Sequence, residues 1–308
     1  MRYYLAIPDI KIHNANAMSS SYTIGFPAMT AWLGAMHALQ RRLRQAGFSD
    51  IVLKKIAVSC HKCDLQVYKD VHDRNFSIIG TANPLKKKGS SFERPPFMEE
   101  ARCHLSVSIL VEIDGYAQDK SKELINSVKR SLYRMKIAGG DIEPNIKEDN
   151  KREYKKKELK IINDVDYSNF RKKVNQLMMP GFMLVERSDL LTKVSGKDNL
   201  DSLIQALSVN VSVERNEKNV ITSFKSKKIL ANSGWLVPAV VGFKDLTGKM
   251  IVANQRDYDY DHYFVEPLVT LGEFIMPYRC ENIDSLMWFY DYDAVNGLYL
   301  CKNNYSED

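Results

Sequence analysis

The stretch Ile12–Leu43 reads IHNANAMSSSYTIGFPAMTAWLGAMHALQRRL and joins a strand-like segment to an amphipathic helix through a polar turn. The preceding segment, Tyr3–Ile12, is rich in apolar and aromatic residues, which predicts a strand. From Pro27 onward, apolar residues recur three or four positions apart, as on one buried helical face: Met29, Trp32, Leu33, Met36, Leu39 and Leu43. Gly47 is expected to end this helix. The chain therefore begins with a strand, a polar loop and a helix.

Further along the chain, the same order of elements repeats. Residues 51–67 have extended character, and 102–113 (RCHLSVSILVEI) predict the clearest strand of the sequence. Residues 120–135 predict an amphipathic helix, which ends before a tight turn at Gly139 and Gly140. With 181–187 (GFMLVER) as a last strand, the order is βαββαβ. The expected fold class is therefore α+β, with a ferredoxin-like (RRM/RAMP) core, a projecting insertion and a C-terminal extension.

Two segments interrupt this order. Residues 68–100 lose periodicity and predict a long projecting loop or hairpin, a type of connection that is more often functional than idle. Residues 147–160 are lysine-rich and nearly devoid of apolar residues, which predicts a surface insertion; attraction to RNA or DNA is the alternative. The expected domains are a core at 1–190, which carries both insertions, and C-terminal strands and helices at 191–308 that pack on it. Within the latter, 264–275 is expected to be a helix or irregular cover.

Composition indicates a soluble globular protein. The 308 residues are 44% hydrophobic and include fifteen glycines and ten prolines, which excludes collagen-like and low-complexity classes. We find no apolar run of the roughly eighteen residues that a membrane span needs, and no signal peptide, so we expect a cytoplasmic protein. Five cysteines, an odd number, make a disulfide framework improbable and predict reduced thiols.

Charge is distributed unevenly along the chain. Residues 254–308 hold three basic and eleven acidic residues, whereas residues 1–253 carry a net charge of +14. A basic body of this kind suits a polyanion through phosphate contacts, and the acidic tail suits a basic protein neighbour. Two solvated faces are the alternative interpretation.

Several kinds of site are absent or weak. The sequence lacks the glycine-rich motifs of nucleotide and dinucleotide sites, so no cofactor is expected. Cys60 and Cys63 have the spacing of zinc ligands, but on a strand they point to opposite faces and no second such pair follows. Carboxylates are scattered except at 257–262 (DYDYDH), which we interpret as a solvated or partner-facing loop. No metal site is expected.

Histidines offer a route to metal-free RNA cleavage, because attack by a ribose 2′-hydroxyl needs a general base and a general acid. The candidates His13, His37, His61 and His104 all lie in the first half of the chain. Satisfied core or interface histidines are the competing interpretation.

The polar loop of the opening stretch is the strongest local site. A helix N-terminus presents unpaired N–H groups and the positive end of a dipole, and small side chains ahead of it let a phosphate approach. Asn14, Asn16 and Ser19 precede the helix, and Thr30 lies in its first turn. The alternative is that these residues only cap the helix and turn the chain.

The opening stretch also resembles the start of the Csy2 family, the Cas5 subunit of subtype I-F CRISPR surveillance complexes. Further blocks follow in family order to residue 300: CHKCDLQ, NPLKKKG, EEARCHLSVSILV, RMKIAGGDI, LMMPGFMLVER, GWLVPAVVGF, FVEPLVTLGEF and GLYL. One block would be weak, but the ordered series is highly specific.

The resemblance implies a non-catalytic RAMP-superfamily protein of antiviral defence. Such a subunit holds the 5′ handle of CRISPR RNA (crRNA) together with the large Csy subunit (Csy1, Cas8 type), next to the Csy3 backbone subunits. A separate endoribonuclease processes the guide, and the assembled ribonucleoprotein pairs it with invading double-stranded DNA. The alternatives are a metal-independent RAMP endoribonuclease that processes repeat RNA, and a scaffold that contacts only proteins.

Carried onto this chain, the resemblance adds RNA-binding candidates to those of the opening loop. Lysines 86–88 fit a thumb-like projection, the arginines at the end of the first helix fit a basic rim, and the rest flank strands or form the glycine turn. The role of 147–160 stays open. The full set of expected RNA-binding residues is Asn14, Asn16, Ser19, Thr30, Arg41, Lys86, Lys87, Lys88, Arg102, His104, Arg134, Lys136, Gly139 and Gly140.

Overall fold

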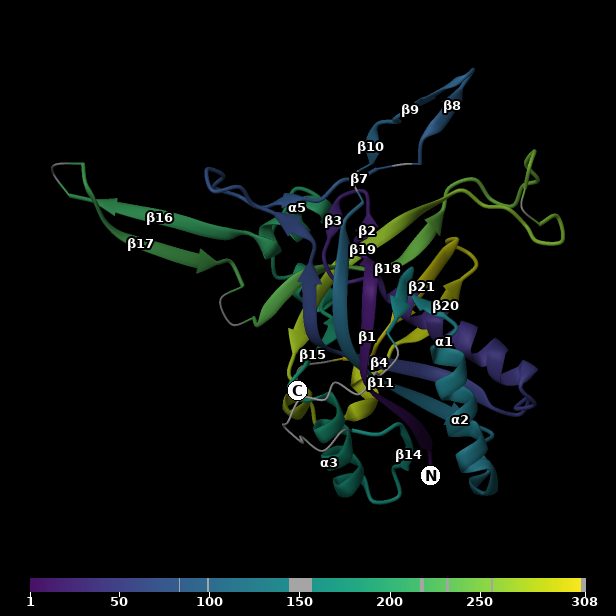
Figure 1. Ribbon diagram of the computed structural model, residues 1–308. Coiled ribbons are helices and arrows are strands. Elements are labelled where there is room, and N and C mark those ends of the chain that lie inside the picture. Colours follow the sequence, from purple (N-terminus) through teal and green to yellow (C-terminus); the bar gives the residue numbers. More distant parts are fainter. Residues whose placement is uncertain are drawn as a thin grey trace. The chain divides into compact units, whose positions relative to one another are not determined.

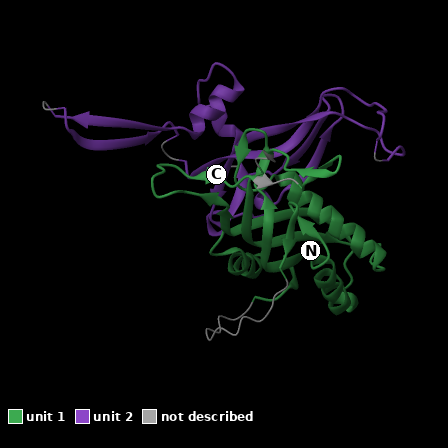
Figure 2. Ribbon diagram, turned by 45° about the horizontal axis from the view of Figure 1, so that its top comes forward, with its two compact units in different colours: residues 1–181 green, residues 182–308 purple. Residues whose placement is uncertain are grey.

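The protein is α+β, with antiparallel sheets and few helices. A computed structural model describes residues 1–82, 84–98, 100–143, 157–216, 219–230, 233–255 and 257–305. The chain divides into two compact units, Met1–Gly181 and Phe182–Asp308 (Figure 2), whereas we expected a boundary after residue 190. Among the described helices, none combines the length and apolarity that crossing a membrane requires.

The first unit contains an antiparallel sheet whose strands follow the order β12, β13, β1, β11, β4, with β14 also paired to β1 (Figure 1). Three helices and a short 3-10 turn connect these strands. The elements are β1 (Tyr3–Asn16), α1 (Met29–Gln45), β4 (Val52–Leu65), β11 (Arg102–Asp114), η1 (Gln118–Lys120), α2 (Ser121–Leu132), β12 (Lys136–Ile137), β13 (Gly140–Ile142), β14 (Lys160–Asn163) and α3 (Tyr167–Met178).

Helix α1 contacts β4 and α2, and its apolar stripe is buried as its spacing predicted. Trp32 is fully buried and stacks on Phe26 with ring centroids 5.3 Å apart. Burial of a side chain of this size contributes roughly 2–3 kcal/mol of hydrophobic stabilisation. The stripe therefore fixes where the N-terminus of α1 lies.

Strand β1 contains two irregularities in its pairing with β11, one between Ile7 and Ile10 and one between Ile12 and Ala15. Asp9 and Asn14 adopt positive φ angles of 48° and 58° at these places, which is conformational space that Asp and Asn visit more readily than most residues. The polar loop that we expected from Asn14 onward is therefore partly strand. Only after Asn16 does the chain turn, through the short pair β2 (Met18–Ser20) and β3 (Thr23–Ile24).

The last strand of the expected βαββαβ order has a different place from the one we assigned. Residues 181–187 do contain a strand, β15 (Phe182–Glu186), but it pairs with β19 (Val265–Ile275) in the second unit. The edge of β1 opposite β11 is held instead by β13 at Ile12 and His13 and by β14 at the start of β1. The sequence predicted only a turn at Gly139 and Gly140 and missed strand β13, which is too short to show a periodicity of its own.

The insertion at 68–100 forms short hairpins. Their strands are β5 (Val67–Tyr68) with β6 (Ser77–Ile78), β7 (Thr81–Ala82) with β10 (Phe97–Met98), and β8 (Lys86–Lys88) with β9 (Ser91–Glu93). The β8–β9 hairpin extends away from the sheet of the first unit (Figure 1). Lys86, Lys87 and Lys88 are all exposed on it.

The second unit contains antiparallel strands in the order β15, β19, β18, β21, β20. Strands β16 and β17 form a separate, almost wholly exposed hairpin (Figure 1). The remaining elements are α4 (Ser188–Leu191), α5 (Asn199–Leu207), β16 (Val209–Arg215), β17 (Ile221–Lys228), β18 (Trp235–Asp245), η2 (Pro277–Arg279), η3 (Ile283–Leu286), β20 (Phe289–Asp293) and β21 (Leu298–Lys302).

Our expectation of a helix or irregular cover at 264–275 was wrong, because this stretch is strand β19. It pairs with β15 on one side and β18 on the other, and its C-terminal half is buried. Its sequence, VEPLVTLGEFI, shows no strict alternation of apolar and polar residues, so periodicity did not identify the strand.

Candidate nucleic-acid interface

An open groove of about 450 Å³ lies where β1 ends and α1 begins. It brings together residues that are far apart in sequence, because the β12–β13 turn packs beside the loop that follows β1. The groove is lined by Asn16, Ser19, Pro27, Ala28, Thr30, Ala31, Ala138 and Gly139. Four of the expected RNA-binding residues, Asn16, Ser19, Thr30 and Gly139, therefore share one surface.

The N-terminus of α1 opens into this groove. Its N-cap is Ala28, which makes no capping hydrogen bond through its side chain, and no acidic residue lies in the first turn. Asn16, which we weighed as a cap, instead forms a local turn: its Oδ1 accepts the N–H of Met18 at 3.1 Å, and its Nδ2 donates to Met18 O. The positive end of the α1 dipole therefore has no capping side chain and no acidic residue in the first turn of the helix, which favours an anion there.

The turn at Ala138–Gly140 forms the opposite wall. The N–H of Asn16 donates to the carbonyl of Ala138 at 2.8 Å, and Gly139 has a φ of 74° that favours glycine. A Cβ on Gly140 would lie 2.7 Å from both the carbonyl oxygen of His13 and the backbone nitrogen of Ala15. Only glycine lets this turn approach β1 so closely.

Arg102 lies at the start of β11, opposite Asn16 in the register of the sheet. Its Nη2 contacts Glu100 Oε2 at 2.7 Å and its Nη1 donates to Asn14 O at 3.4 Å. The guanidinium is about one-third exposed, so it stays accessible beside the groove.

A second open groove, of about 510 Å³, lies on the other side of Asn14. It is lined by His13, Asn14, Asp64, Leu65, Gln66, Val67, Ile79 and His104. The rings of His13 and His104 lie with centroids 4.2 Å apart and an interplanar angle of 34°. Nδ1 of His104 accepts the N–H of Asn14 at 3.3 Å, which ties the irregular part of β1 to β11.

Sequence reasoning missed Gln66 as a site residue. Its side-chain amide contacts Asn14 Oδ1 at 2.5 Å and His104 Nε2 at 3.1 Å, and its backbone N–H donates to Arg102 O. Gln66 closes the CHKCDLQ block, but nothing in its residue type indicated a site. The only signal was its position directly after a strand.

The remaining expected residues lie elsewhere in the first unit. Arg41 is eleven residues beyond Thr30 on α1, roughly 16 Å along the helix axis. Arg134 accepts a hydrogen bond from Arg42 through its carbonyl, at 2.9 Å, and Lys136 pairs with Asp141 at 2.8 Å. Neither these cations nor the lysines of the β8–β9 hairpin line either groove.

The lysine-rich segment is described only from residue 157 onward; residues 147–156 lie outside the described residues. Lys157 Nζ donates to the carbonyls of Leu177 and Met179, at 2.9 and 2.8 Å, at the C-terminal end of α3. This cation therefore stabilises a helix end.

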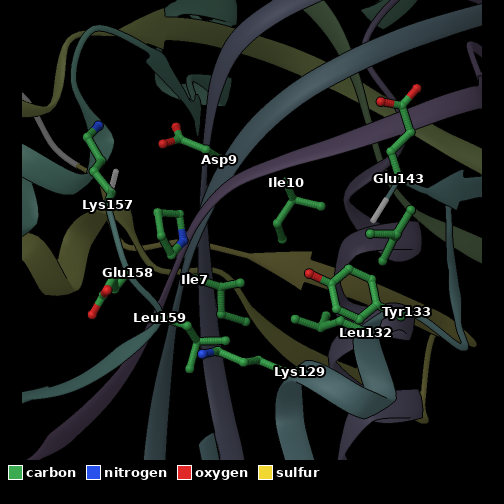
Figure 3. Close-up of a pocket in the computed structure, with 12 residues that line it drawn as sticks. Ile7, Asp9, Ile10, Lys129, Leu132, Tyr133, Glu143, Lys157, Glu158 and Leu159 are labelled. Carbon is green, nitrogen blue, oxygen red and sulfur yellow. The ribbon is translucent and has the colours of Figure 1, made fainter. Parts of the chain in front are cut away.

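Lys157 also lines a third cavity, of about 330 Å³, between β1, α2 and residues 157–159 (Figure 3). Its floor is aliphatic, whereas its rim mixes Asp9, Glu143 and Glu158 with Lys129, Lys157 and Tyr133. Figure 3 shows Asp9 and Lys157 on one side and Tyr133 and Glu143 on the other. With three carboxylates among its charges, this cavity is unsuited to a phosphate chain.

Among the histidine and cysteine candidates, His61 has a structural partner. His61 Nε2 lies 2.7 Å from Ser108 Oγ, and burial lowers the pKa of its ring. His37 is exposed on α1. Burial raises the pKa of Cys60 to about 12, which disfavours a metal-binding thiolate. Within the described residues, no three His, Cys, Asp or Glu side chains are grouped to hold a metal ion.

Comparison with known proteins matches nearly the whole chain. Residues 5–301 fit the family described as CRISPR-associated protein (Cas_Csy2). The CRISPR-associated protein Csy2 of Pseudomonas aeruginosa (strain UCBPP-PA14) is 31% identical over 313 residues, which cover 96% of this chain and 93% of that protein. The expected resemblance is therefore confirmed, and this chain belongs to the Csy2 family of CRISPR-associated proteins.

Proposed function

We propose that this chain is a non-catalytic subunit of a type I-F Csy complex and holds the 5′ handle of CRISPR RNA there. In this proposal it acts with the large Csy subunit and lies next to the Csy3 backbone subunits. The assembled complex then uses the guide to recognise invading double-stranded DNA. Membership of the Csy2 family supports the complex, and the grooves of the first unit support the RNA contact.

We also propose that the first unit is a ferredoxin-like RAMP core. In the βαββαβ order, the first strand lies between the third and fourth, and the second lies outside the third. Here β1 lies between β11 and the pair β13 and β14, and β4 lies outside β11. The order of strands, all antiparallel, supports this assignment even though 181–187 does not supply the fourth strand.

One observation carries the RNA-binding proposal: the N-terminus of α1 is uncapped by side chains and opens into the groove that Asn16, Ser19, Thr30 and Gly139 line. Backbone N–H groups at such an end bind phosphate without reading sequence. RNA single strands with splayed bases need both phosphate contacts and planar or amide groups nearby. The adjacent groove supplies two imidazoles and two carboxamides.

The test uses the full-length chain co-expressed with the large Csy subunit and titrated with RNA of the 5′ handle. The double variant Asn16→Leu and Ser19→Val is expected to weaken binding at least tenfold. It removes polar atoms from the groove and widens no cavity. The double variant Gln45→Leu and Ser49→Val, at and just beyond the other end of α1, is the matched control. Equal affinity of both double variants and the parent protein would contradict the proposal.

The endoribonuclease alternative makes a separate prediction. Incubation of the purified protein with repeat RNA in EDTA is expected to leave the RNA intact, because His61 is engaged with Ser108 and His37 lies outside both grooves. Specific cleavage that is lost in His13→Ala or His104→Ala would establish the enzyme instead.

A further inference from the structure

We propose that the groove between His13, Gln66 and His104 is a seat for one unstacked nucleobase, separate from the phosphate-binding groove at the N-terminus of α1. This inference rests on the proposed RNA-binding function and specifies which part of a nucleotide each groove receives. The two grooves adjoin because Asn14 lines one and Asn16 the other, two residues apart on β1. Two residues of strand span about 7 Å, within the reach of a single nucleotide.

The histidine pair supplies a stacking platform. His13 is exposed and His104 is partly buried, with their ring centroids 4.2 Å apart. Two contacts hold the His104 ring in place. Its Nδ1 accepts the N–H of Asn14, and its Nε2 lies 3.1 Å from the Gln66 amide. His13 has no side-chain hydrogen bond to any described residue, so its exposed ring is available to a base. Proteins commonly stack single-stranded RNA bases on such rings.

The carboxamides of Asn14 and Gln66 give the seat its polar edge. The Gln66 side-chain amide lies 3.1 Å from Nε2 of His104, whose Nδ1 accepts the N–H of Asn14. Gln66 Nε2 also donates to Oδ1 of Asn14 at 2.5 Å. Each carboxamide keeps one polar atom that makes no hydrogen bond to a described residue. That atom is in position to hydrogen-bond the edge of a base.

The charges around this groove favour a base over a phosphate. Its lining includes the exposed carboxylate of Asp64, which is held by Lys62 at 3.0 Å, and the apolar side chains of Leu65, Val67 and Ile79. A carboxylate repels a phosphate, whereas aliphatic side chains suit the flat face of a base. In contrast, the groove at α1 is lined by no carboxylate and faces the positive end of a helix.

The experiment is a cycle of protein variants against RNA substitutions, with the full-length chain co-expressed with the large Csy subunit. The 5′ handle RNA is prepared with one abasic ribose at each position in turn, and each dissociation constant is measured. His13→Ala is expected to weaken binding of intact handle RNA about tenfold, the low-to-middle range of one base–aromatic stack. His13→Phe keeps a stacking ring and is expected to retain most of the affinity.

The decisive result is whether the effect of an abasic substitution in the RNA depends on the substitution in the protein. At one position, the abasic substitution is expected to cost about tenfold with the parent protein and nearly nothing with His13→Ala or with Gln66→Ala. The salt dependence of binding is expected to stay the same, because no phosphate contact is removed. His37→Ala, an exposed histidine on α1, is the matched control and is expected to show no coupling.

Each outcome decides between the two proposals. Abasic penalties that are identical in His13→Ala and the parent protein at every position overturn the nucleobase seat and leave the handle-binding function standing. A parent complex that does not bind handle RNA at all overturns both. Circular dichroism spectra that match the parent protein show that a loss of affinity comes from the seat and not from unfolding.

Discussion

The buried side chain of Gln40 accepts the backbone N–H of Leu53 at 2.6 Å and donates to the carbonyl of Ile51. One side chain of α1 thus supplies hydrogen-bond partners for two backbone groups at the start of β4. Because α1 is held to the sheet here and by its apolar stripe, the place of its N-terminus beside β1 is fixed.

Gln40→Leu is expected to lower the free energy of unfolding by about 2–4 kcal/mol, because two buried backbone groups lose their partners. Urea denaturation measures the change. Gln45→Leu, exposed in the last turn of the same helix, is the control and is expected to change stability by less than about 0.5 kcal/mol. Equal effects of the two substitutions would show that the Gln40 hydrogen bonds contribute little.

Stability is expected to decrease in mild acid because of His61. Burial lowers the pKa of its ring, as does the charge of Lys157, while Asp9 opposes this effect. In the unfolded chain a histidine titrates near pH 6.5, so below that pH the unfolded state takes up a proton that the folded state resists. The stabilisation is therefore complete above about pH 6.5 and is lost as the pH falls toward the lower folded pKa.

The measurement is the free energy of unfolding of the parent protein and His61→Gln between pH 7.5 and pH 5. The difference between them is expected to shrink as the pH falls. His37→Gln, an exposed histidine, should follow the parent curve in parallel. A pH-independent difference between His61→Gln and the parent would rule out the proposed linkage.

Glu100 is expected to restrain RNA binding. Its carboxylate pairs with Arg102 at 2.7 Å beside the groove at the N-terminus of α1. Glu100→Gln releases the guanidinium, so affinity for handle RNA should rise a few-fold at low salt and depend more steeply on salt concentration. Asp114→Asn, which releases Lys54 at the other end of β11, is the control. An unchanged salt dependence in Glu100→Gln would place Arg102 outside the RNA path.

The second unit depends on a buried charge network. Arg187 is 1% exposed and pairs with Glu273 and Asp189, while Glu273 Oε1 also accepts the N–H of Gly234 at 2.7 Å. Glu273→Leu should destabilise this unit by about 3–5 kcal/mol, because it leaves a buried charge with one partner fewer. The double variant Glu273→Leu and Arg187→Met is expected to recover much of that loss in thermal unfolding. A double variant less stable than the single one would contradict this.

Sequence reasoning succeeded where a pattern had one structural meaning. The three-or-four spacing from Met29 to Leu43 predicted α1 and its buried face, and 102–113 predicted β11. It failed for β19, where apolar residues do not alternate strictly with polar ones and no strand period is visible. It also placed Asn14 in a loop, because polar residues with positive φ inside a strand carry no distinguishing pattern.

For the site, the sequence singled out Asn16, Ser19 and Thr30 around the start of α1, and Gly139 only as part of a separate turn. Asn16, Ser19, Thr30 and Gly139 share a groove, whereas Arg41 follows its helix away from it. Gln66 was missed because its role depends on Asn14 and His104, which only strand pairing brings to it. Long-range register is a property of the folded sheet and leaves no local trace in the chain.

The close approach of Gly140 to β1 has a consequence for how this protein diverges. The wall it builds consists of main-chain atoms, including the Asn16 to Ala138 hydrogen bond, so exchanging neighbouring side chains leaves its contour intact. Related chains can therefore differ in most of the surrounding side chains and keep the same groove wall, provided that the residue at this position remains glycine.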